Sequence, residues 1–252
     1  MEFKDKVILV TGGSRGIGRA VARAFAARGG RLAVHYGHDE ASARQTLSLL
    51  DGEGHAIFGA DLAHPEACEN LVENVVGSMG RLDVLVNNAA IYQTGSFEDM
   101  DYAQWQASWK QTLAVNLVGP ANLSFLAARA MSAASGGRIV NISSRGAFRG
   151  EPTAVAYGAS KAGLNAMTQS LAQALAPHNI FLGVVAPGFV ETDMAKAILD
   201  GPAGPGIRAQ SPLGRVAKPE EVARAVVFLA SPGTEFSTGT IIDVNGASYL
   251  RS

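Results

Sequence analysis

Tyr157 and Lys161 are the pair of residues in this chain best suited to proton transfer. Residues four apart share one face of a helix, so in a helix the lysine reaches toward the tyrosine hydroxyl. A phenol has an ordinary pKa of about 10 and is a poor base at neutral pH, but a nearby ammonium group favours the phenolate and lowers that pKa. The alternative is a surface tyrosine beside a solvated lysine.

Ser143 and Ser144 follow a short apolar run just upstream of that tyrosine. The run, residues 138–142, is predicted to be a central strand, and doubly wound sheets place their ligands at the C-terminal ends of strands. A serine hydroxyl there can donate a hydrogen bond to a substrate oxygen. Serine pairs at strand ends are also common as turns or caps.

The segment Thr11–Gly18 is rich in glycine, follows a strand-like run and opens a helix-like run. Glycines let the backbone approach a pyrophosphate, and a helix N-terminus supplies unpaired N–H groups and positive potential. The spacing Gly12-x3-Gly16-x-Gly18 differs from the usual dinucleotide fingerprint. The segment predicts a dinucleotide site, with an ordinary tight turn as the alternative.

The elements that must position these residues are predicted from alternating short apolar runs and longer stretches of helical period. Several of the runs are apolar on both faces, as in parallel strands covered by helices on each side. We expect strands over 7–10, 32–34, 56–58, 84–86, 138–142, 183–186 and 241–244. We expect helices over 16–29, 40–50, 65–79, 103–132, 157–176 and 219–230. This order predicts an α/β fold with a doubly wound, seven-stranded parallel sheet flanked by helices on both faces.

One segment, 189–211, departs from the alternation. Its stretch Gly201–Gly206 contains only glycine, proline and one alanine, and is expected not to sustain regular structure. Because the segment follows the sixth strand, it is expected to be a mobile substrate lid. Residues 1–252 are otherwise expected to form a single dinucleotide-binding and catalytic domain.

Composition excludes several classes of protein. The 21 Lys and Arg balance 22 Asp and Glu, which argues against a nucleic-acid partner. No apolar run approaches the roughly 20 residues that a membrane span needs. The single cysteine, Cys68, allows no intrachain disulfide, and the five histidines form no ligand group with it, so no metal is expected. With no leader-like N-terminal segment, a cytoplasmic enzyme is expected.

Together, the glycine-rich segment, the serine pair and the Tyr-Lys pair resemble the short-chain dehydrogenase/reductase family, in its short single-domain branch. The resemblance extends from about Lys4 to Ser248, and the whole pattern is most similar to bacterial 3-oxoacyl-thioester reductases. Further matches follow in order along the chain: Asp61-Leu62, Asn87-Asn88-Ala89-Ala90, Asn116, Pro187-Gly188, Thr192, Leu213-Gly214-Arg215 and Pro219–Ala223.

The resemblance implies a Rossmann-type fold and a role for each matching residue. It makes Tyr157 the catalytic acid/base, Lys161 its pKa modulator and nicotinamide-ribose ligand, and Ser144 the group that polarises the substrate carbonyl. Ser144 is preferred to Ser143 because thirteen residues separate it from Tyr157, the family's usual interval. Asn116 is expected to hold a proton-relay water on its backbone carbonyl, left free by Pro120. The implied cofactor residues, besides Tyr157 and Lys161, are Gly12, Ser14, Arg15, Gly16, Ile17, Gly18, Tyr36, His38, Asp61, Leu62, Asn88, Ala89, Ala90, Pro187, Gly188, Val190 and Thr192.

The cofactor is predicted to be NADP(H), with NAD(H) as the alternative. NAD specificity normally uses a carboxylate at the end of the second strand, and the resemblance places Tyr36 there. Arg15 can reach a 2′-phosphate, and His38 adds a donor when protonated. Two features weaken the prediction. The acids Asp39 and Glu40 directly follow His38, and Arg15 has the alternative of only capping a helix or pairing locally.

The implied reaction interconverts a carbonyl and a secondary alcohol on a small molecule, and Tyr157 delivers the proton. The alternatives are a sugar, steroid or xenobiotic carbonyl reductase and, in another class, a non-catalytic dinucleotide sensor. A sensor need not keep Asn116, Ser144, Tyr157 and Lys161 together. Arg145 and Arg149, near the serine, either bind an anionic substrate or are solvated loop charges.

A homotetramer is also implied, with the helices at 103–132 and 157–176 forming one interface. These helices carry small apolar residues that suit close packing but could equally meet the sheet. They are Ala127, Ala128, Ala162 and Ala166.

Overall fold

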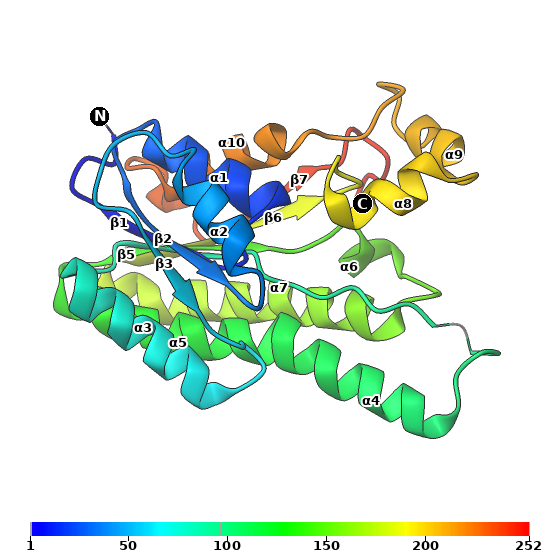
Figure 1. The fold of residues 1–252 in the computed structure, drawn as a ribbon, viewed down its shortest axis with the longest axis horizontal. Coiled ribbons are helices and arrows are strands. Elements are labelled where there is room, and N and C mark those ends of the chain that lie inside the picture. The colour runs from blue at the N-terminus through cyan, green and yellow to red at the C-terminus, as the bar shows by residue number, and fades with distance from the viewer. Residues whose placement is uncertain (1, 96, 252) are drawn as a thin grey trace.

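The sheet has seven strands in the order β3-β2-β1-β4-β5-β6-β7, and every pairing is parallel. This computed structural model describes residues 2–95 and 97–251, and it confirms the predicted fold class (Figure 1). The strands are β1 (Val7–Val10), β2 (Arg31–Tyr36), β3 (Ala56–Gly59), β4 (Val84–Asn87), β5 (Gly137–Ile142), β6 (Ile180–Pro187) and β7 (Ile241–Val244). The strand order reverses between β1 and β4, where doubly wound sheets form their ligand crevice.

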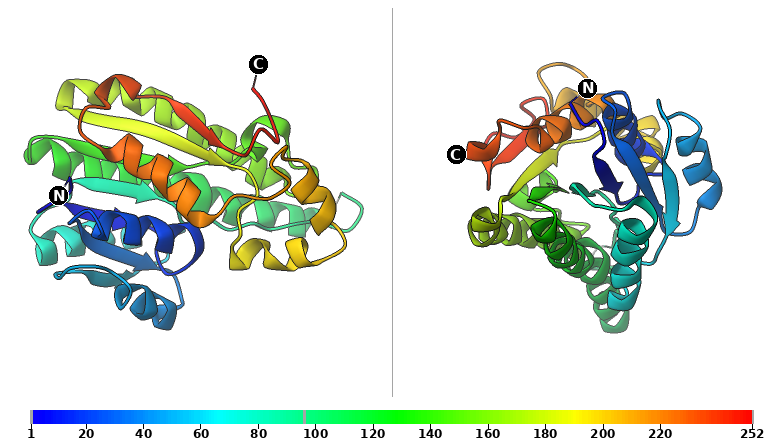
Figure 2. Two further views of the ribbon diagram at one scale, coloured as in Figure 1. Left: turned by 90° about the horizontal axis from the view of Figure 1, so that it is seen from above. Right: turned by 90° about the vertical axis from the view of Figure 1, so that its left-hand side faces the viewer.

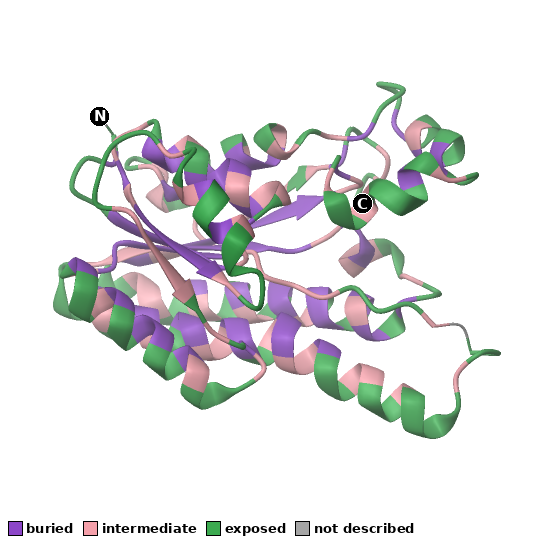
Figure 3. Ribbon diagram, viewed as in Figure 1, coloured by how far each residue is buried: buried purple, intermediate pink, exposed green. Residues whose placement is uncertain are grey.

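Helices cover both faces of the sheet, as Figures 1 and 2 show. On one face lie α1 (Gly16–Ala26), α2 (Glu40–Leu47) and α10 (Pro219–Ala230). On the other lie α3 (Pro65–Met79), α5 (Gly119–Ala133) and α7 (Val155–Leu175), with α4 (Tyr102–Leu113) extending beyond the sheet. The central strands between the two layers are largely buried, whereas the edge strands β3 and β7 are only partly buried (Figure 3).

Strand β1 shows why the sheet needs cover on both sides. All four of its residues are fully buried. Side chains alternate across a strand, so Ile8 and Val10 join the core under α1 and α10, whereas Val7 and Leu9 join the core under α3 and α5. The sheet therefore separates two apolar cores.

The helix expected over 103–132 is divided by a π-helical turn, η1 (Ala114–Val118). Pro120 has no N–H group, so the regular bond to the Asn116 carbonyl cannot form. The Gly119 N–H instead donates to the Ala114 carbonyl, five residues back. The chain therefore forms a wider, π-helical turn at this point, which is a frequent feature of functional sites. The relay role of Asn116 stays a prediction.

The segment 189–211 contains regular structure, contrary to expectation. It forms α8 (Asp193–Asp200) and α9 (Gly204–Ala209). Thr192 caps α8 by accepting a hydrogen bond from the Ala195 N–H at 3.4 Å. Pro205 lies in the first turn of α9, where proline is tolerated because the N–H there has no helical partner. The prediction that Gly201–Gly206 lacks regular structure is therefore wrong for residues 204–206, which lie in α9.

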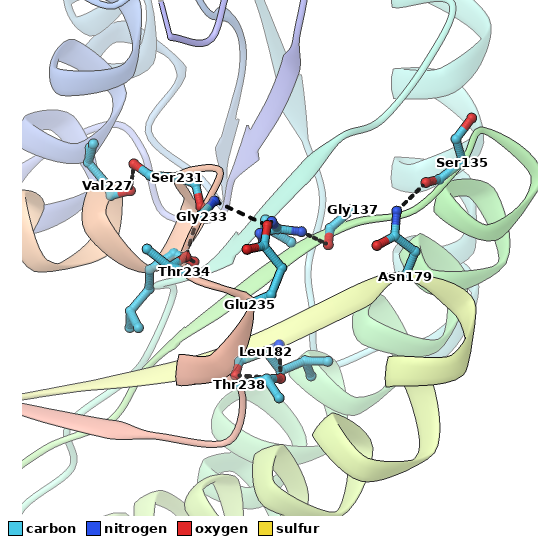
Figure 4. A network of polar contacts seen from close by, with 12 residues as sticks. Ser135, Gly137, Asn179, Leu182, Val227, Ser231, Gly233, Thr234, Glu235 and Thr238 are labelled. Atoms are coloured by element: carbon cyan, nitrogen blue, oxygen red, sulfur yellow. Dashed lines mark hydrogen bonds and ion pairs between the residues drawn. The ribbon is translucent and has the colours of Figure 1, made fainter.

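A polar network fastens the other end of β5 and β6, away from the ligand crevice (Figure 4). The Asn179 side chain donates to the Ser135 carbonyl at 2.8 Å. The Thr238 hydroxyl accepts from the Leu182 N–H at 3.0 Å, in the first half of β6. The 3₁₀ turns η2 (Ala176–His178) and η3 (Glu235–Ser237) lie beside these contacts, and the short helix α6 (Gly146–Arg149) follows β5.

Among the helices of the described residues, none combines the length and apolar character of a membrane span. The histidine, cysteine, aspartate and glutamate side chains in the same part of the chain form no group of three that could hold a metal ion.

Candidate active site

The structure brings Ser144, Tyr157 and Lys161 together at the C-terminal end of β5. Tyr157 lies in the first turn of α7, and the Lys161 Nζ lies 5.7 Å from the centre of its ring. Ser144 lies close enough to Tyr157 to lower its pKa, and its hydroxyl accepts a hydrogen bond from the Gly146 N–H at 3.0 Å. The Ser143 hydroxyl instead donates to the Lys161 carbonyl at 3.2 Å. This placement agrees with the choice of Ser144 over Ser143.

Burial dominates the electrostatics of Tyr157. It raises the pKa of Tyr157 to about 12, although the hydrogen bond with Ser144 acts in the opposite direction. Burial also lowers the pKa of Lys161 to about 8, and its Nζ donates to the Ile142 carbonyl at 2.8 Å. The role of Lys161 in lowering the pKa of Tyr157 stays a prediction. With a pKa of about 12, the Tyr157 hydroxyl keeps its proton at neutral pH.

Asn116 connects the π-helical turn to the loop after β4. Its side-chain amide donates to the Ile91 carbonyl and accepts from the Ile91 N–H, both at 2.9 Å. Tyr92, which follows Ile91 in the chain, packs edge-on against the Tyr157 ring, with the two ring centroids 4.8 Å apart. Tyr92 is thus a wall of the site, two residues after the Asn-Asn-Ala-Ala match and at the start of the segment 92–97 expected to line the substrate pocket.

The glycine-rich turn has the shape that a dinucleotide pyrophosphate requires. Gly12 and Gly16 adopt positive φ values of 60° and 55°. A Cβ on Gly18 would lie 2.1 Å from the Gly12 carbonyl oxygen, and one on Gly16 would lie 3.2 Å from Thr192. The first turn of α1 holds no acidic residue and its N-cap, Arg15, makes no side-chain cap bond. The positive end of α1 is therefore left for an anion.

His35 positions this turn from β2, and no motif had singled it out. The Gly12 N–H donates to its Nδ1 and its Nε2 lies 3.0 Å from the Ala60 carbonyl, so the neutral ring carries its proton on Nε2. Burial lowers the pKa of His35 to about 4, despite the Ala60 carbonyl and the Asp61 carboxylate. The ring accepts a bond from the turn only while it is neutral.

His35 should make the folded state sensitive to acid. Its pKa is about 4 in the folded protein, against the ordinary value of 6.5, so the unfolded chain binds more protons below pH 6.5 and stability falls as pH drops. From pH 7 to pH 5 this linkage removes about 2 kcal/mol from the free energy of unfolding. Urea unfolding of the wild type should show that extra loss relative to His35→Gln, whereas exposed His38→Gln should retain it. Equal losses in the wild type and His35→Gln would contradict this role.

The loop after β4 is tied to the same turn. The Thr11 hydroxyl accepts hydrogen bonds from the Asn88 N–H at 2.9 Å and the Ala89 N–H at 3.0 Å. The Asn88 side chain donates to the Thr11 carbonyl at 2.8 Å. These bonds hold the predicted adenosine-side residues beside the glycine turn, with Ala90 next along the chain.

The acids after β2 are engaged with their own helix. Asp39 caps α2, accepting from the Ser42 N–H at 2.9 Å, and its pKa is lowered by the Ser42 bonds and further by the Arg15 and Arg19 charges. Glu40 accepts from Arg44 at 2.8 Å and from the Tyr36 hydroxyl at 3.1 Å.

The other residues predicted for the adenosine end differ in accessibility. Arg15 and His38 are exposed, and so is Asp61, which accepts from the Ala63 N–H at 3.0 Å. Leu62 differs from the rest, because its side chain is buried in the core under α3.

The predicted nicotinamide strip lies between β6 and α8. Pro187 ends β6, and the Gly188 N–H donates to the Val244 carbonyl at 3.0 Å. Val190 is buried and bridges to Ala217. Thr192, at the end of the strip, lies close to Gly16 of the glycine turn. A cavity of about 470 Å³ is lined by both of these residues.

Sequence comparison decides the family. The family described as Enoyl-(Acyl carrier protein) reductase matches residues 12–247. The 3-oxoacyl-[acyl-carrier-protein] reductase FabG of Salmonella typhimurium is 37% identical over 250 residues, covering 99% of this chain and 100% of the relative. The chain belongs to the short-chain dehydrogenase/reductase family. The acetoacetyl-CoA reductase of Rhizobium meliloti, 37% identical over 247 residues and covering 98% of this chain and 99% of the relative, is another member.

Membership in the short-chain dehydrogenase/reductase family makes this chain an NAD(P)-dependent oxidoreductase. The family recognition, the α/β fold and the enzyme class predicted from the sequence are confirmed.

Proposed function

We propose that this enzyme reduces the carbonyl of a 3-oxoacyl compound to a secondary alcohol with NADPH. The observation that carries the proposal is the placement of Tyr157 beside Ser144, which acts on its pKa, and beside Lys161, whose Nζ lies 5.7 Å from its ring centre. The names of the relatives support the substrate class.

The side chains divide the chemistry among them. When bound, the cofactor supplies the hydride. Ser144 donates a hydrogen bond to the substrate carbonyl oxygen, and Tyr157 transfers its hydroxyl proton to that oxygen. Because burial keeps the pKa of Tyr157 near 12, the proton stays on the phenol until charge develops on the substrate. Lys161 stabilises the phenolate that remains, and a water on the Asn116 carbonyl resupplies the proton.

The residues present fit the cofactor. The glycine turn and the acid-free N-terminus of α1 suit a pyrophosphate. Pro187, Gly188, Val190 and Thr192 would hold the nicotinamide side, and Asp61 would accept from the adenine amine. Arg15 would bind the 2′-phosphate of NADP(H), since Tyr36 stands where NAD enzymes place a carboxylate and Glu40 is already bonded to Arg44.

Steady-state turnover with NADPH on a substrate panel tests the proposal. The panel holds acetoacetyl-CoA, the same acyl group on an acyl carrier protein, crotonyl-CoA, a ketose, a steroid ketone and an aromatic ketone. Among the compounds of this panel we expect the 3-oxo thioesters to have the highest kcat/KM, and the carrier-bound and carrier-free forms to be comparable. Residues 130–137 at the end of α5 are uncharged, so the exposed Arg129 just before them is the cation that this end of the helix presents to an acidic carrier. Preference for crotonyl-CoA or a ketose, or cofactor binding without any turnover, would overturn the proposal.

A homotetramer is the assembly we propose. Ala162 and Ala166 on α7 are exposed and free to meet a second copy, whereas Ala127 and Ala128 on α5 are buried in the core. The exposed Phe125 adds apolar area on α5. Light scattering should give the mass of four chains, and Ala166→Glu should reduce this mass while the circular dichroism spectrum still shows a folded chain. A monomeric wild type would refute the assembly.

A further inference from the structure

Arg145 is the side chain whose environment differs most from the sequence expectation of a solvated loop charge. It is only 3% exposed, and its Nη1 donates to the Ser248 hydroxyl at 2.7 Å. Its guanidinium lies 5.4 Å from the Phe189 ring centre. Arg149, by contrast, is exposed, and its Nε lies 4.0 Å from the Glu151 Oε1. The two arginines therefore differ in role.

The burial of Arg145 is not compensated by an ion pair. Among the ion pairs of residues 2–95 and 97–251, none includes its guanidinium. Burial lowers its pKa, the neighbouring Arg149 lowers it further, and Glu151 partly offsets both. An unpaired buried cation is unfavourable for folding, and a neutral side chain of similar size would be more stable there. A ligand that supplies the missing negative charge explains why the position carries arginine.

A cavity of about 90 Å³ lies in front of Arg145. It is formed between the segment carrying α8 and α9 and the chain that follows β7, and Phe189, Ser211 and Ser248 line it with Arg145. One water needs about 10–15 Å³ of such volume, so the cavity has room for a carboxylate group.

The other charges that line the cavity cancel one another. The Arg215 guanidinium donates two hydrogen bonds to the Glu221 carboxylate, both at 2.7 Å. Arg145 is therefore the uncompensated charge of the cavity, and it is positive.

The cavity adjoins the proposed chemistry. Arg145 directly follows Ser144, and its backbone N–H donates to the Pro187 carbonyl at 2.8 Å. Phe189 directly follows Gly188 of the nicotinamide strip. Arg145 and Phe189, which line the cavity, therefore connect it along the chain to the serine and to the nicotinamide strip.

Resting on the proposed function, we infer that Arg145 binds a carboxylate of the substrate, which is therefore an oxo acid, a ketone with a free carboxylate on the same small molecule. Guanidinium and carboxylate groups match in geometry and form two parallel charge-assisted hydrogen bonds. The Ser248 hydroxyl, which accepts from Nη1, orients the guanidinium.

Paired substrates test the inference. We would measure kcat/KM with NADPH for 3-oxobutanoate, 4-oxopentanoate and 5-oxohexanoate, each beside its methyl ester. For the best chain length the wild type should prefer the acid by roughly 10- to 100-fold, the range that one or two charge-assisted bonds supply. Arg145→Met should reduce this acid-to-ester ratio to about one. The matched control Arg149→Met should keep it.

Each outcome decides a separate point. Equal kcat/KM for acid and ester in the wild type at every chain length, or a ratio that Arg145→Met leaves unchanged, overturns the inference. Turnover of acetoacetyl-CoA with no preference for acids would sink this inference alone, whereas no turnover of any ketone would sink the proposed function. A thermal melt verifies that Arg145→Met is folded. If it is not, Arg145→Lys, which cannot form the paired bonds, should still lower the ratio several-fold.

Discussion

Tyr157→Phe should lower kcat by about 10²- to 10⁴-fold, the usual contribution of a general acid. The substitution removes the only proton donor proposed for the carbonyl oxygen. It keeps the aromatic ring, so the edge-on contact with Tyr92 and the proximity to Lys161 remain. NADPH affinity, measured by fluorescence titration, should therefore change little while single-turnover reduction of acetoacetyl-CoA becomes slow.

The control for that substitution is Tyr102→Phe, which removes a hydroxyl from an exposed tyrosine at the start of α4. It should turn over like the wild type. If Tyr157→Phe stays within about threefold of the wild type, Tyr157 is not the acid and the proton must come from elsewhere.

Arg15→Ala should reduce the preference for NADPH over NADH by roughly 10- to 100-fold, since charge-assisted bonds to a phosphate contribute about 1.5–3 kcal/mol each. Arg15 starts α1 without capping it, and its exposed side chain is free to meet a 2′-phosphate. The measurement is kcat/KM for both cofactors at one substrate concentration. Arg28→Ala, at the other end of α1, should leave the ratio unchanged. A wild type that prefers NADH, or an NADPH preference that survives Arg15→Ala, would contradict the assignment.

The strands could be predicted because their burial leaves little choice of residue. Val7–Val10 is apolar at four consecutive positions, and the structure buries each of them between two helical layers. The π-helical turn could not be predicted, because Pro120 implies a lost hydrogen bond but not how the helix adjusts. Helix α9 was missed because glycine and proline are poor helix formers by propensity, whereas Ile207 is held there by packing with Leu199 and Val216.

The candidate site, like the fold, could be predicted from the sequence only in part. The interval between Ser144 and Tyr157 predicted which serine lies beside the tyrosine, because Ser144 follows the end of β5 by two residues and Tyr157 lies in the first turn of α7. His35 left no such signal. The role of His35 depends on the parallel register of β1 and β2, which pairs Val10 with Val34. This register places His35, the residue after Val34, where its Nδ1 accepts from the Gly12 N–H. The burial of Arg145 likewise depends on the distant Ser248.

The π-helical turn makes the site sensitive to the number of residues in a helix, separately from their identity. Successive residues of a helix are about 100° apart around its axis. Deleting one residue within 114–118 would allow a regular helix but rotate α4 by about that angle relative to α5. Asn116 could not then reach Ile91 while Leu123 and Ala127 stayed in the core. Chain length at this point is thus a constraint on activity that aligned catalytic residues alone would not reveal.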